Sequence, residues 1–472
     1  MTETPFAEDV LVAGIDSSSQ STKVLLVRAA DGVIVDEASA PHPPGTEIDP
    51  TVWWEALQQA GAGLLERASA IAVGGQQHGM VTLDAAGELV RPALLWNDLR
   101  SAPQIAEVVD RLGGAQACAD EIGSVPAASF TITKLRWLAE NEPDNAARTA
   151  AVLLPHDWLT WKLAGGSAAG ATMTTDHGDA SGTGYYSPAR RAWLPELAQW
   201  AVGRSAADPQ VELPTIAAPS EVVGRTAFGA ALGAGTGDNM AAALGLGLRD
   251  GDVAISIGTS GTAFCVTDAP MADPTGSVAG FADATGRYLP LVATVNAARV
   301  LAVLGNLLGV DHTEYGELAL SAPAGAGGLT LLPYLDGERT PNRPHATGVF
   351  SGLTSAVSRA DVARAGVEAL LCSLADAVDA LGISPLRVLM IGGAARNPAI
   401  QQLAPAILGV DVLVPQPAEY VALGAARQAA WALAGTPNPP DWAAAPASLF
   451  TAAPTPQVRT QYGVLREETQ DW

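Results

Sequence analysis

Short apolar stretches alternate with turns of small and polar residues at the start of the chain. Residues 10–15 are apolar, residues 16–22 form a serine-rich turn, and residues 24–27 are apolar again. An Asp-Gly pair at 31–32, typical of a tight hairpin, comes before the apolar residues 33–35. This pattern predicts three consecutive strands joined by short turns.

Helical patterns and short apolar runs alternate along the rest of the chain, which predicts an α/β fold. The clearest helix begins at Ser358, which forms the sequence of a capping box with Asp361. Apolar residues then recur every three or four positions over 367–381, and Gly382 marks the end of the helix. A strand over 387–391 and a glycine turn follow, and Asn397 is expected to cap a further helix.

The serine-rich turn at the start of the chain has a counterpart in the second half. Residues 15–22 align with residues 255–262, so that Ser256 stands 240 positions (256 − 16) after Asp16. A repeated strand–turn–strand at half the chain length predicts two related domains that face each other. We place their boundary just after Asn239, among the glycines of 233–247, and assign domains of 1–242 and 243–472.

The charge of the chain limits its partners. The sequence has 49 acidic and 26 basic residues, a net charge of −23 and an isoelectric point near 4.5. Such a surface repels phosphate backbones and anionic lipids, so we expect neither a nucleic-acid nor a membrane partner. The beginning of the chain has no signal-peptide pattern, and no apolar run is long enough to cross a membrane.

The chain has three cysteines, Cys118, Cys265 and Cys372, which lie far apart in the sequence. An odd number of cysteines without a CxxC pair is unlike a disulfide framework or a zinc site. We expect them to be buried thiols in a cytoplasmic protein.

The two turns at 16–22 and 258–262 are rich in glycine, serine and threonine. Backbone N–H groups in such turns can converge on an anion, so two turns suit a polyphosphate held between the domains; an ordinary hairpin is the alternative for either turn alone. The sequence has no Gly-Lys pair and no strict GxGxxG, which excludes a Walker loop and a Rossmann fingerprint.

Other motifs place polar groups after apolar runs. Asp238 follows a glycine-rich turn, where its carboxylate can accept a proton from an attacking hydroxyl; for the isolated motif, a turn-forming aspartate is the commoner explanation. Gln77 and His78 follow one apolar run, and the segment from Trp96 to Asp98 follows another. Amide, imidazole, carboxylate and indole groups together suit a polyol, although a single histidine is often structural.

In this order the motifs resemble the FGGY carbohydrate kinases, and among them the xylulokinases. The resemblance covers residues 10–435 and is carried by Gly14-Ile15-Asp16 with Lys23, GQQHG at 75–79, RPALLWNDLR at 91–100, GTGDN at 235–239, SIGTSGT at 256–262, LPYLDGERTP at 332–341, IGGAARNP at 391–398 and ALGAA at 422–426. The resemblance implies two ribonuclease-H-like domains of the actin/hexokinase type, with ATP and sugar in the cleft between them.

The resemblance also implies roles for individual residues. Asp238 is then the catalytic base and Asp16 the acidic residue that holds Mg²⁺ through water. The implied sugar contacts are Gln77, His78, Trp96, Asp238 and Asn239, and the implied ATP contacts are Ser19, Thr22, Lys23, Gly258, Thr259, Ser260, Gly392, Gly393, Ala394 and Asn397. The chain departs from many relatives at Ser18, where they have glycine, and at Gln77, where they have methionine.

The implied reaction is transfer of the γ-phosphoryl group of ATP to the 5-hydroxyl of D-xylulose. A homodimer is a possible assembly of such an enzyme. A sister kinase acting on ribulose, gluconate or a deoxyketose is the nearest alternative. An actin- or chaperone-like ATPase and a non-catalytic sugar sensor are further alternatives; the ATPase would not need Gln77, His78 and Trp96, and the sensor would not need both Asp16 and Asp238.

Overall fold

The computed structural model describes residues 6–470, and its contacts divide the chain into two units. The first unit contains the chain up to Gly247 together with Thr267–Leu289 and Glu419–Ala444. The second unit contains Leu248–Val266, Pro290–Ala418 and the chain from Ala445 onwards. The expected domains 1–242 and 243–472 are continuous halves, whereas the chain returns twice to the first unit. The expected limit also falls inside helix α9 (Asp238–Leu246), which continues to the end of its apolar run.

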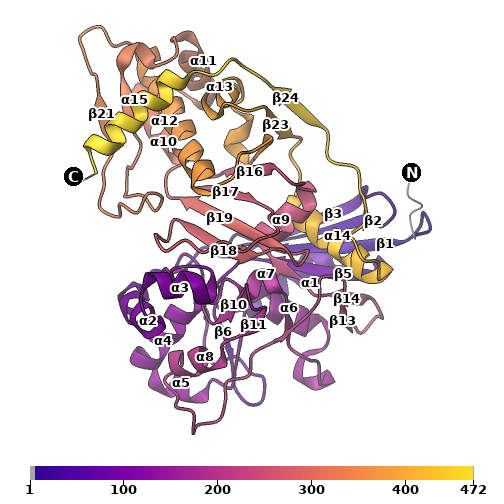
Figure 1. The fold of residues 1–472 in the computed structure, drawn as a ribbon. Helices are drawn as coiled ribbons and strands as arrows, with labels where there is room; N and C mark the ends of the chain where they lie inside the picture. The colour runs from indigo at the N-terminus through magenta and orange to yellow at the C-terminus, as the bar shows by residue number, and fades with distance from the viewer. Residues whose placement is uncertain (1–5, 471–472) are drawn as a thin grey trace. The chain divides into compact units, whose positions relative to one another are not determined.

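The first unit is built on a sheet in the order β13-β14-β5-β1-β2-β3, with β15 paired to β5 (Figure 1). Strand β1 pairs antiparallel with β2 and parallel with β5, and β2 pairs antiparallel with β3. These pairings confirm the three predicted strands. The strands are β1 (Leu11–Ser17), β2 (Ser21–Arg28), β3 (Ile34–Pro41), β5 (Ala70–Gly75), β13 (Val222–Arg225), β14 (Ala231–Gly233) and β15 (Thr236–Gly237).

Helices and short strands surround this sheet. The helices are α1 (Thr51–Gly61), α2 (Ile105–Leu112), α3 (Ala115–Ile122), α4 (Thr131–Asn141), α5 (Pro143–Arg148), α6 (Pro155–Leu163), α7 (His177–Ala180), α8 (Pro195–Ala201), α9 and α14 (Tyr420–Ala434). The short strands are β4 (Glu47–Ile48), β6 (Val81–Leu83), β7 (Ala93–Leu94), β8 (Ala151–Leu153), β9 (Thr174–Thr175), β10 (Tyr186–Ser187), β11 (Ala192–Trp193), β12 (Thr215–Ile216) and β18 (Val278–Ala282).

The central strand β1 is buried on both faces. Ala13 and Ile15 belong to one core cluster, which also contains Trp53 of α1 and Trp158 of α6. Val12 belongs to a second cluster, made largely of alanines of α14. Successive side chains of a strand point to opposite faces, so β1 joins both cores.

Helix α14 packs unusually closely on this sheet (Figure 1). A Cβ atom on Gly14 of β1 would overlap the carbonyl oxygen of Ala422, and one on Gly424 would overlap that of Ala241 in α9. The small residues of ALGAA therefore allow backbone-to-backbone approach within the first unit.

The second unit repeats the arrangement, with strands in the order β19-β17-β16-β22-β23-β24. Strand β16 pairs antiparallel with β17 and parallel with β22, as β1 does with β2 and β5. The strands are β16 (Asp252–Ile257), β17 (Gly261–Cys265), β19 (Tyr288–Thr294), β20 (Thr330–Leu332), β21 (Val349–Ser351), β22 (Arg387–Ile391), β23 (Val412–Pro415) and β24 (Ala447–Phe450).

The two repeated turns differ in length. In the first hairpin Ser17 pairs with Thr22, whereas in the second Ile257 pairs with Gly261. The first turn therefore contains one residue more. The ungapped alignment of 15–22 with 255–262 is wrong after the turn, because the register of each hairpin depends on its own loop length.

The helices of the second unit confirm the predicted caps. Its helices are α10 (Ala298–Leu308), α11 (His312–Ser321), α12 (Arg359–Ala380), α13 (Pro398–Leu408) and α15 (Pro456–Glu468). The Ser358 N–H donates to the Asp361 carboxylate at 2.9 Å, and the Ser358 hydroxyl accepts from the Asp361 N–H at 3.2 Å. Asn397 caps α13, since its Oδ1 accepts from the Ala399 N–H at 2.9 Å.

The three cysteines are free and buried, as expected. Within residues 6–470, none of the helices combines the length and the apolar character that a membrane crossing requires.

Candidate active site

Asp16 lies near the end of β1 in the first unit and is only 5% exposed. Its Oδ1 atom is buried and has no hydrogen-bond partner among the described residues. Burial raises the pKa of Asp16 to about 7, while Lys23 opposes this shift and Glu419 adds to it. A buried carboxylate oxygen without a partner is the kind of group that a cation or a bound water can satisfy.

The turn after Asp16 holds its shape through Ser18. The Ser18 hydroxyl donates to the carbonyl of Ser21 at 3.0 Å and lies 3.3 Å from the Ser21 N–H. Ser18 is absent from the described residues with positive φ, so the serine that replaces the glycine of many relatives is not strained. This departure leaves the turn intact.

Ser19 and Trp96, expected to contact ATP and sugar respectively, are hydrogen-bonded to each other. The indole N–H of Trp96 donates to the Ser19 hydroxyl at 2.9 Å, and that hydroxyl donates to Gln76 Oε1 at 3.3 Å. The Trp96 side chain is 44% exposed, so its ring is accessible. The turn and the tryptophan therefore hold each other in place.

Thr22 and Lys23 follow the same turn but point to protein partners. Thr22 is fully buried, and its hydroxyl lies 2.9 Å from His42 Nε2. His42 Nδ1 lies 3.0 Å from the carbonyl of Ser18, which can only accept, so His42 Nε2 accepts from Thr22. Lys23 pairs with Glu419 at 2.5 Å. Thr22 thus supports the turn through His42, and Glu419 partly neutralises the charge of Lys23.

Asp238 begins helix α9, directly after the glycine-rich turn. Its Oδ1 accepts from the backbone N–H of Asn239 and from Asn239 Nδ2, both at 2.8 Å. Asn239 Nδ2 also donates to Gln77 Oε1 at 3.1 Å. The structure thus brings together three of the predicted sugar-site residues, from α9 and from the segment after β5.

Asp238 keeps part of its surface exposed, yet its environment strongly disfavours charge. Burial raises the pKa of Asp238 to about 7, and the nearby charge of Asp16 adds to the shift. Two carboxylates of the first unit are therefore close enough to influence each other. A carboxylate with a pKa near neutral pH is suited to accept and release a proton.

His78 takes a left-handed backbone conformation, with a φ of 66°. Its ring stacks on Phe130 with centroids 4.9 Å apart, and Phe281 lies 5.8 Å away. His78 Nδ1 lies 2.6 Å from the carbonyl oxygen of Gly182, so Nδ1 carries a proton. In the neutral ring Nε2 is therefore the acceptor atom.

A fully buried ion cluster supports the two strand ends that carry these residues. His156 Nδ1 lies 2.6 Å from Asp179, and Nε2 lies 3.2 Å from Asp157. Burial lowers the pKa of His156, but the two carboxylates outweigh it and raise the pKa to about 9. A Cβ on Gly75 would overlap the Cβ and backbone of His156, and one on Gly235 would overlap its ring, so His156 fills the space beside β5 and the turn before Asp238.

The remaining charged groups around Trp96 are structural. Asp98 is buried and accepts from Thr46 at 2.8 Å and from Arg100 at 2.9 Å. Arg100 and Arg91 both pair with Glu47, at 2.7 and 2.5 Å. These pairs hold the segment that carries Trp96, which explains the charged residues of RPALLWNDLR.

In the second unit, the turn Gly258–Ser260 is exposed at the end of β16. The N–H of Ala297 donates to the Thr259 carbonyl at 3.1 Å, and that of Ala298 donates to the Gly258 carbonyl at 3.0 Å. The loop before α10 therefore holds this turn in place.

The predicted adenosine turn lies beside it. Strands β16 and β22 are parallel neighbours, and a Cβ on Gly392 would overlap the backbone of Ile257. Gly392, which has a φ of 93°, and Gly393 are exposed, whereas Ala394 and Asn397 are buried. Two of the expected ATP turns thus meet at one edge of the sheet, with Asn397 engaged as a helix cap.

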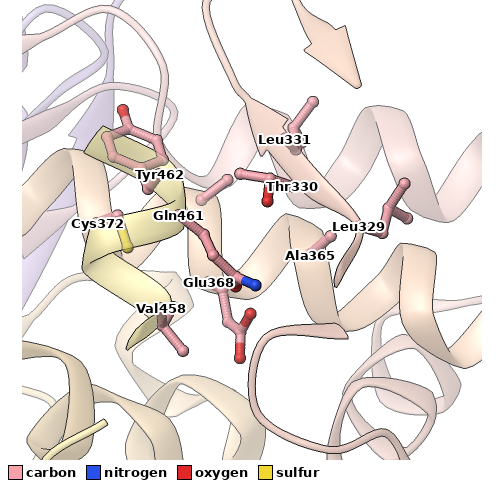
Figure 2. A pocket seen from close by; sticks show the side chains of 10 residues that line it. Leu329, Thr330, Leu331, Ala365, Glu368, Cys372, Val458, Gln461 and Tyr462 are labelled. Carbon is pink, nitrogen blue, oxygen red and sulfur yellow. The ribbon is translucent and has the colours of Figure 1, made fainter. Parts of the chain in front are cut away.

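A small hollow between β20, α12 and α15 also lies in the second unit (Figure 2). Figure 2 shows the side chains of Glu368 and Gln461 at its centre. Its free interior of about 10 Å³ is close to the minimum for one water molecule. This hollow is too small for a sugar or a nucleotide.

Comparison with known proteins identifies the family. The model of the FGGY family of carbohydrate kinases, N-terminal domain, matches residues 11–251, and that of the C-terminal domain matches residues 253–433. The chain belongs to the FGGY family of carbohydrate kinases. This membership confirms the two-domain actin/hexokinase-like fold expected from the sequence.

Individual members of the FGGY family are similar to this chain over most of its length. The chain is 47% identical to the xylulose kinase of Streptomyces coelicolor over 91% of this chain and 89% of the relative. It is 46% identical to the xylulose kinase of Streptomyces rubiginosus over the same shares. The crystal structure of xylulose kinase from Bifidobacterium adolescentis matches with a TM-score of 0.91 and 45% identity, covering 98% of this chain and all of that one.

Sequence reasoning missed several groups of this kinase site. Phe130 and Phe281 contact the His78 ring from distant segments, and Glu419 partly neutralises Lys23 from the last segment of the first unit. No local pattern connects these residues. The one sequence signal for these contacts was the position of Glu419, just before the ALGAA motif.

Proposed function

We propose that this chain is an ATP-dependent D-xylulose kinase that phosphorylates the 5-hydroxyl of the sugar. The observation that carries the proposal is the Asp238 carboxylate, whose pKa is raised to about 7 and which is hydrogen-bonded through Asn239 to Gln77. The high identity to two xylulose kinases supports the choice of sugar.

Asp238 acts as the general base. Asn239 occupies Oδ1, while no hydrogen bond from residues 6–470 reaches Oδ2. Oδ2 is therefore the atom that accepts the proton as the sugar hydroxyl attacks the γ-phosphorus and the bond to the β-phosphate oxygen breaks. The pKa of about 7 allows the carboxylate to be ionised before the reaction and protonated after it.

The sugar is held by the groups around this carboxylate. Gln77 Nε2 is buried without a hydrogen-bond partner among the described residues, so a sugar hydroxyl would satisfy it. His78, whose Nδ1 is committed to the carbonyl of Gly182, is a further sugar contact. The exposed ring of Trp96 provides an apolar face for the carbon chain. Gln77 thus offers a donor where many relatives have methionine.

In the second unit, ATP is bound by the turns Gly258–Ser260 and Gly392–Ala394, in which every residue except Ala394 is exposed. The unsatisfied Oδ1 of Asp16 fits a water of the Mg²⁺ shell, and the ion would supply charge neutralisation for the phosphates. Water has to be excluded when the phosphoryl group reaches the hydroxyl beside Asp238, since it competes as an acceptor.

A sugar panel tests the proposal. Purified protein with Mg-ATP is supplied with D-xylulose, D-ribulose, gluconate or glycerol, and ADP release is followed by a coupled assay. We expect D-xylulose to give the highest kcat/KM. A preference for another ketose or for gluconate would favour a sister kinase, and ADP release that no sugar stimulates would favour an actin-type ATPase. Assembly as a homodimer and residence in the cytoplasm stay predictions.

A further inference from the structure

Arg339 lies in the loop between β20 and β21 of the second unit, and among residues 6–470 its guanidinium forms no ion pair. In the same loop, Asp336 pairs with Arg299 at 2.7 Å, and Arg343 donates to the carbonyl of Arg466 at 2.7 Å. Across residues 6–470, the guanidinium of Arg339 donates to no acceptor, although its side chain is partly buried. A partly desolvated guanidinium is costly unless an anion binds it.

The adjacent Glu338 makes no direct ion pair with this guanidinium, because its carboxylate oxygens accept hydrogen bonds from other groups. Glu338 accepts from the N–H of Val295 at 2.6 Å, from Asn296 Nδ2 at 3.0 Å and from the N–H of Arg339 at 2.7 Å. Burial lowers the pKa of the Arg339 guanidinium below its usual value, and the charge of Glu338 only partly opposes this. The guanidinium is thus left without a dedicated anion.

The same hydrogen bonds connect Arg339 to the turn Gly258–Ser260. Glu338 holds residues 295–296, and the next two residues, Ala297 and Ala298, donate to the carbonyls of Thr259 and Gly258. All these residues belong to the second unit. The loop that carries Arg339 and the turn expected to bind phosphate are therefore fixed to one another.

We propose that Arg339 binds the phosphate chain of ATP beside the turn Gly258–Ser260. This inference rests on the proposed function, which makes ATP a substrate. A chain with a net charge of −23 cannot attract ATP over its whole surface, and Lys23 is partly neutralised by Glu419. A guanidinium matches a phosphate with two parallel hydrogen bonds, which is the partner that Arg339 lacks.

The test compares Arg339→Met and Arg339→Lys with the wild type by calorimetric titration of the full chain with Mg-ATP, ADP and AMP. We expect Arg339→Met to bind ATP about 10- to 100-fold more weakly, the range for losing a hydrogen bond to a charged group. AMP binding should change less than ATP binding, and Arg339→Lys should lie between the wild type and Arg339→Met, because it keeps the charge but not the paired donors.

Arg299→Gln is the matched control, since it removes one positive charge near the same turn from an exposed pair with Asp336. We expect its ATP affinity to stay within about twofold of the wild type. Equal weakening in Arg299→Gln and Arg339→Met would show a general charge effect and would overturn the proposal. Unchanged ATP affinity in Arg339→Met would overturn it too, as would equal weakening of ATP and AMP binding.

Thermal unfolding without nucleotide separates binding from a structural role. Arg339→Met should unfold at the wild-type temperature or above it, because a desolvated, unpaired charge is removed. A clearly lower unfolding temperature in both Arg339 variants, with ATP affinity restored at low temperature, would make Arg339 structural. Wild-type protein that binds ATP but does not phosphorylate D-xylulose would contradict the proposed function and leave this test valid; wild-type protein that does not bind ATP would contradict both.

Discussion

Replacing Asp238 by asparagine removes the charge and the proton acceptor but keeps the shape of the side chain. The retained Oδ1 can still accept from the N–H of Asn239, which lies at 2.8 Å. We expect kcat with D-xylulose to fall by about 10²- to 10⁴-fold, the usual contribution of a general base. ATP binding should change by less than about twofold, because Asp238 is proposed to face the sugar.

The same substitution should stabilise the protein, for a reason that its pKa makes quantitative. The pKa of Asp238 is raised from 3.8 to about 7, chiefly by burial. At about 1.36 kcal/mol per pH unit, the ionised carboxylate costs at most about 4 kcal/mol. Because the side chain keeps some exposure and its surroundings relax, we expect about 2 kcal/mol.

The sign of this effect follows from the protons bound. Between pH 3.8 and about 7 the native Asp238 carboxyl holds its proton more often than the unfolded one. The unfolding free energy of the wild type therefore falls as the pH rises through that window. Asparagine does not titrate. The difference in unfolding free energy between Asp238→Asn and the wild type should therefore grow with rising pH. It should reach about half of the expected 2 kcal/mol at pH 5.5 and all of it at pH 8.

The assays are coupled ADP release for turnover and chemical unfolding at pH 5.5 and 8 for stability. Asp441→Asn, which changes an exposed aspartate of the first unit, is the control and should leave both measurements unchanged. Wild-type turnover in Asp238→Asn would refute the catalytic role. A variant that is less stable than the wild type at pH 8 would refute the reasoning from burial.

Three further substitutions test the site and its support. His78→Asn should raise the KM for the sugar by about 10-fold or more while the KM for ATP stays constant, and an unchanged KM for every pentulose would exclude His78 as a sugar contact. Gly14→Ala places a methyl group against the carbonyl of Ala422 and should destabilise the protein by about 2 kcal/mol or more in urea unfolding, so a wild-type midpoint would contradict the close packing. His156→Gln removes the positive charge between two buried carboxylates and should lower the unfolding free energy by about 3–5 kcal/mol, and equal stability at pH 7 would show that this ring is not charged.

Much of the site was predictable because its motifs are local and ordered. The two hairpins, the cap formed by Asn397 and the aspartate after the glycine turn could all be identified from short segments. The roles of Ser19 and Thr22 were less accessible. Their hydroxyls are bound by Trp96 and His42, and those contacts depend on how distant segments fold onto the turn.

The sequence by itself determined the α/β class, the duplicated strand–turn–strand and the helix caps. Each of these depends on residues within a few positions of one another, where backbone geometry and local hydrogen bonds dominate. The eight ordered motifs added the family, because their combination is far more specific than any one of them.

Only the tertiary structure decided where α14 belongs and which carboxylates are perturbed. The chain returns to the first unit at Glu419, where the small residues of α14 pack on Gly14 and Glu419 pairs with Lys23. The raised pKa values of Asp16 and Asp238 arise from burial and from their mutual proximity. Residues far apart in sequence create both conditions, so desolvation and charge proximity, unlike a helix cap, have no local signature.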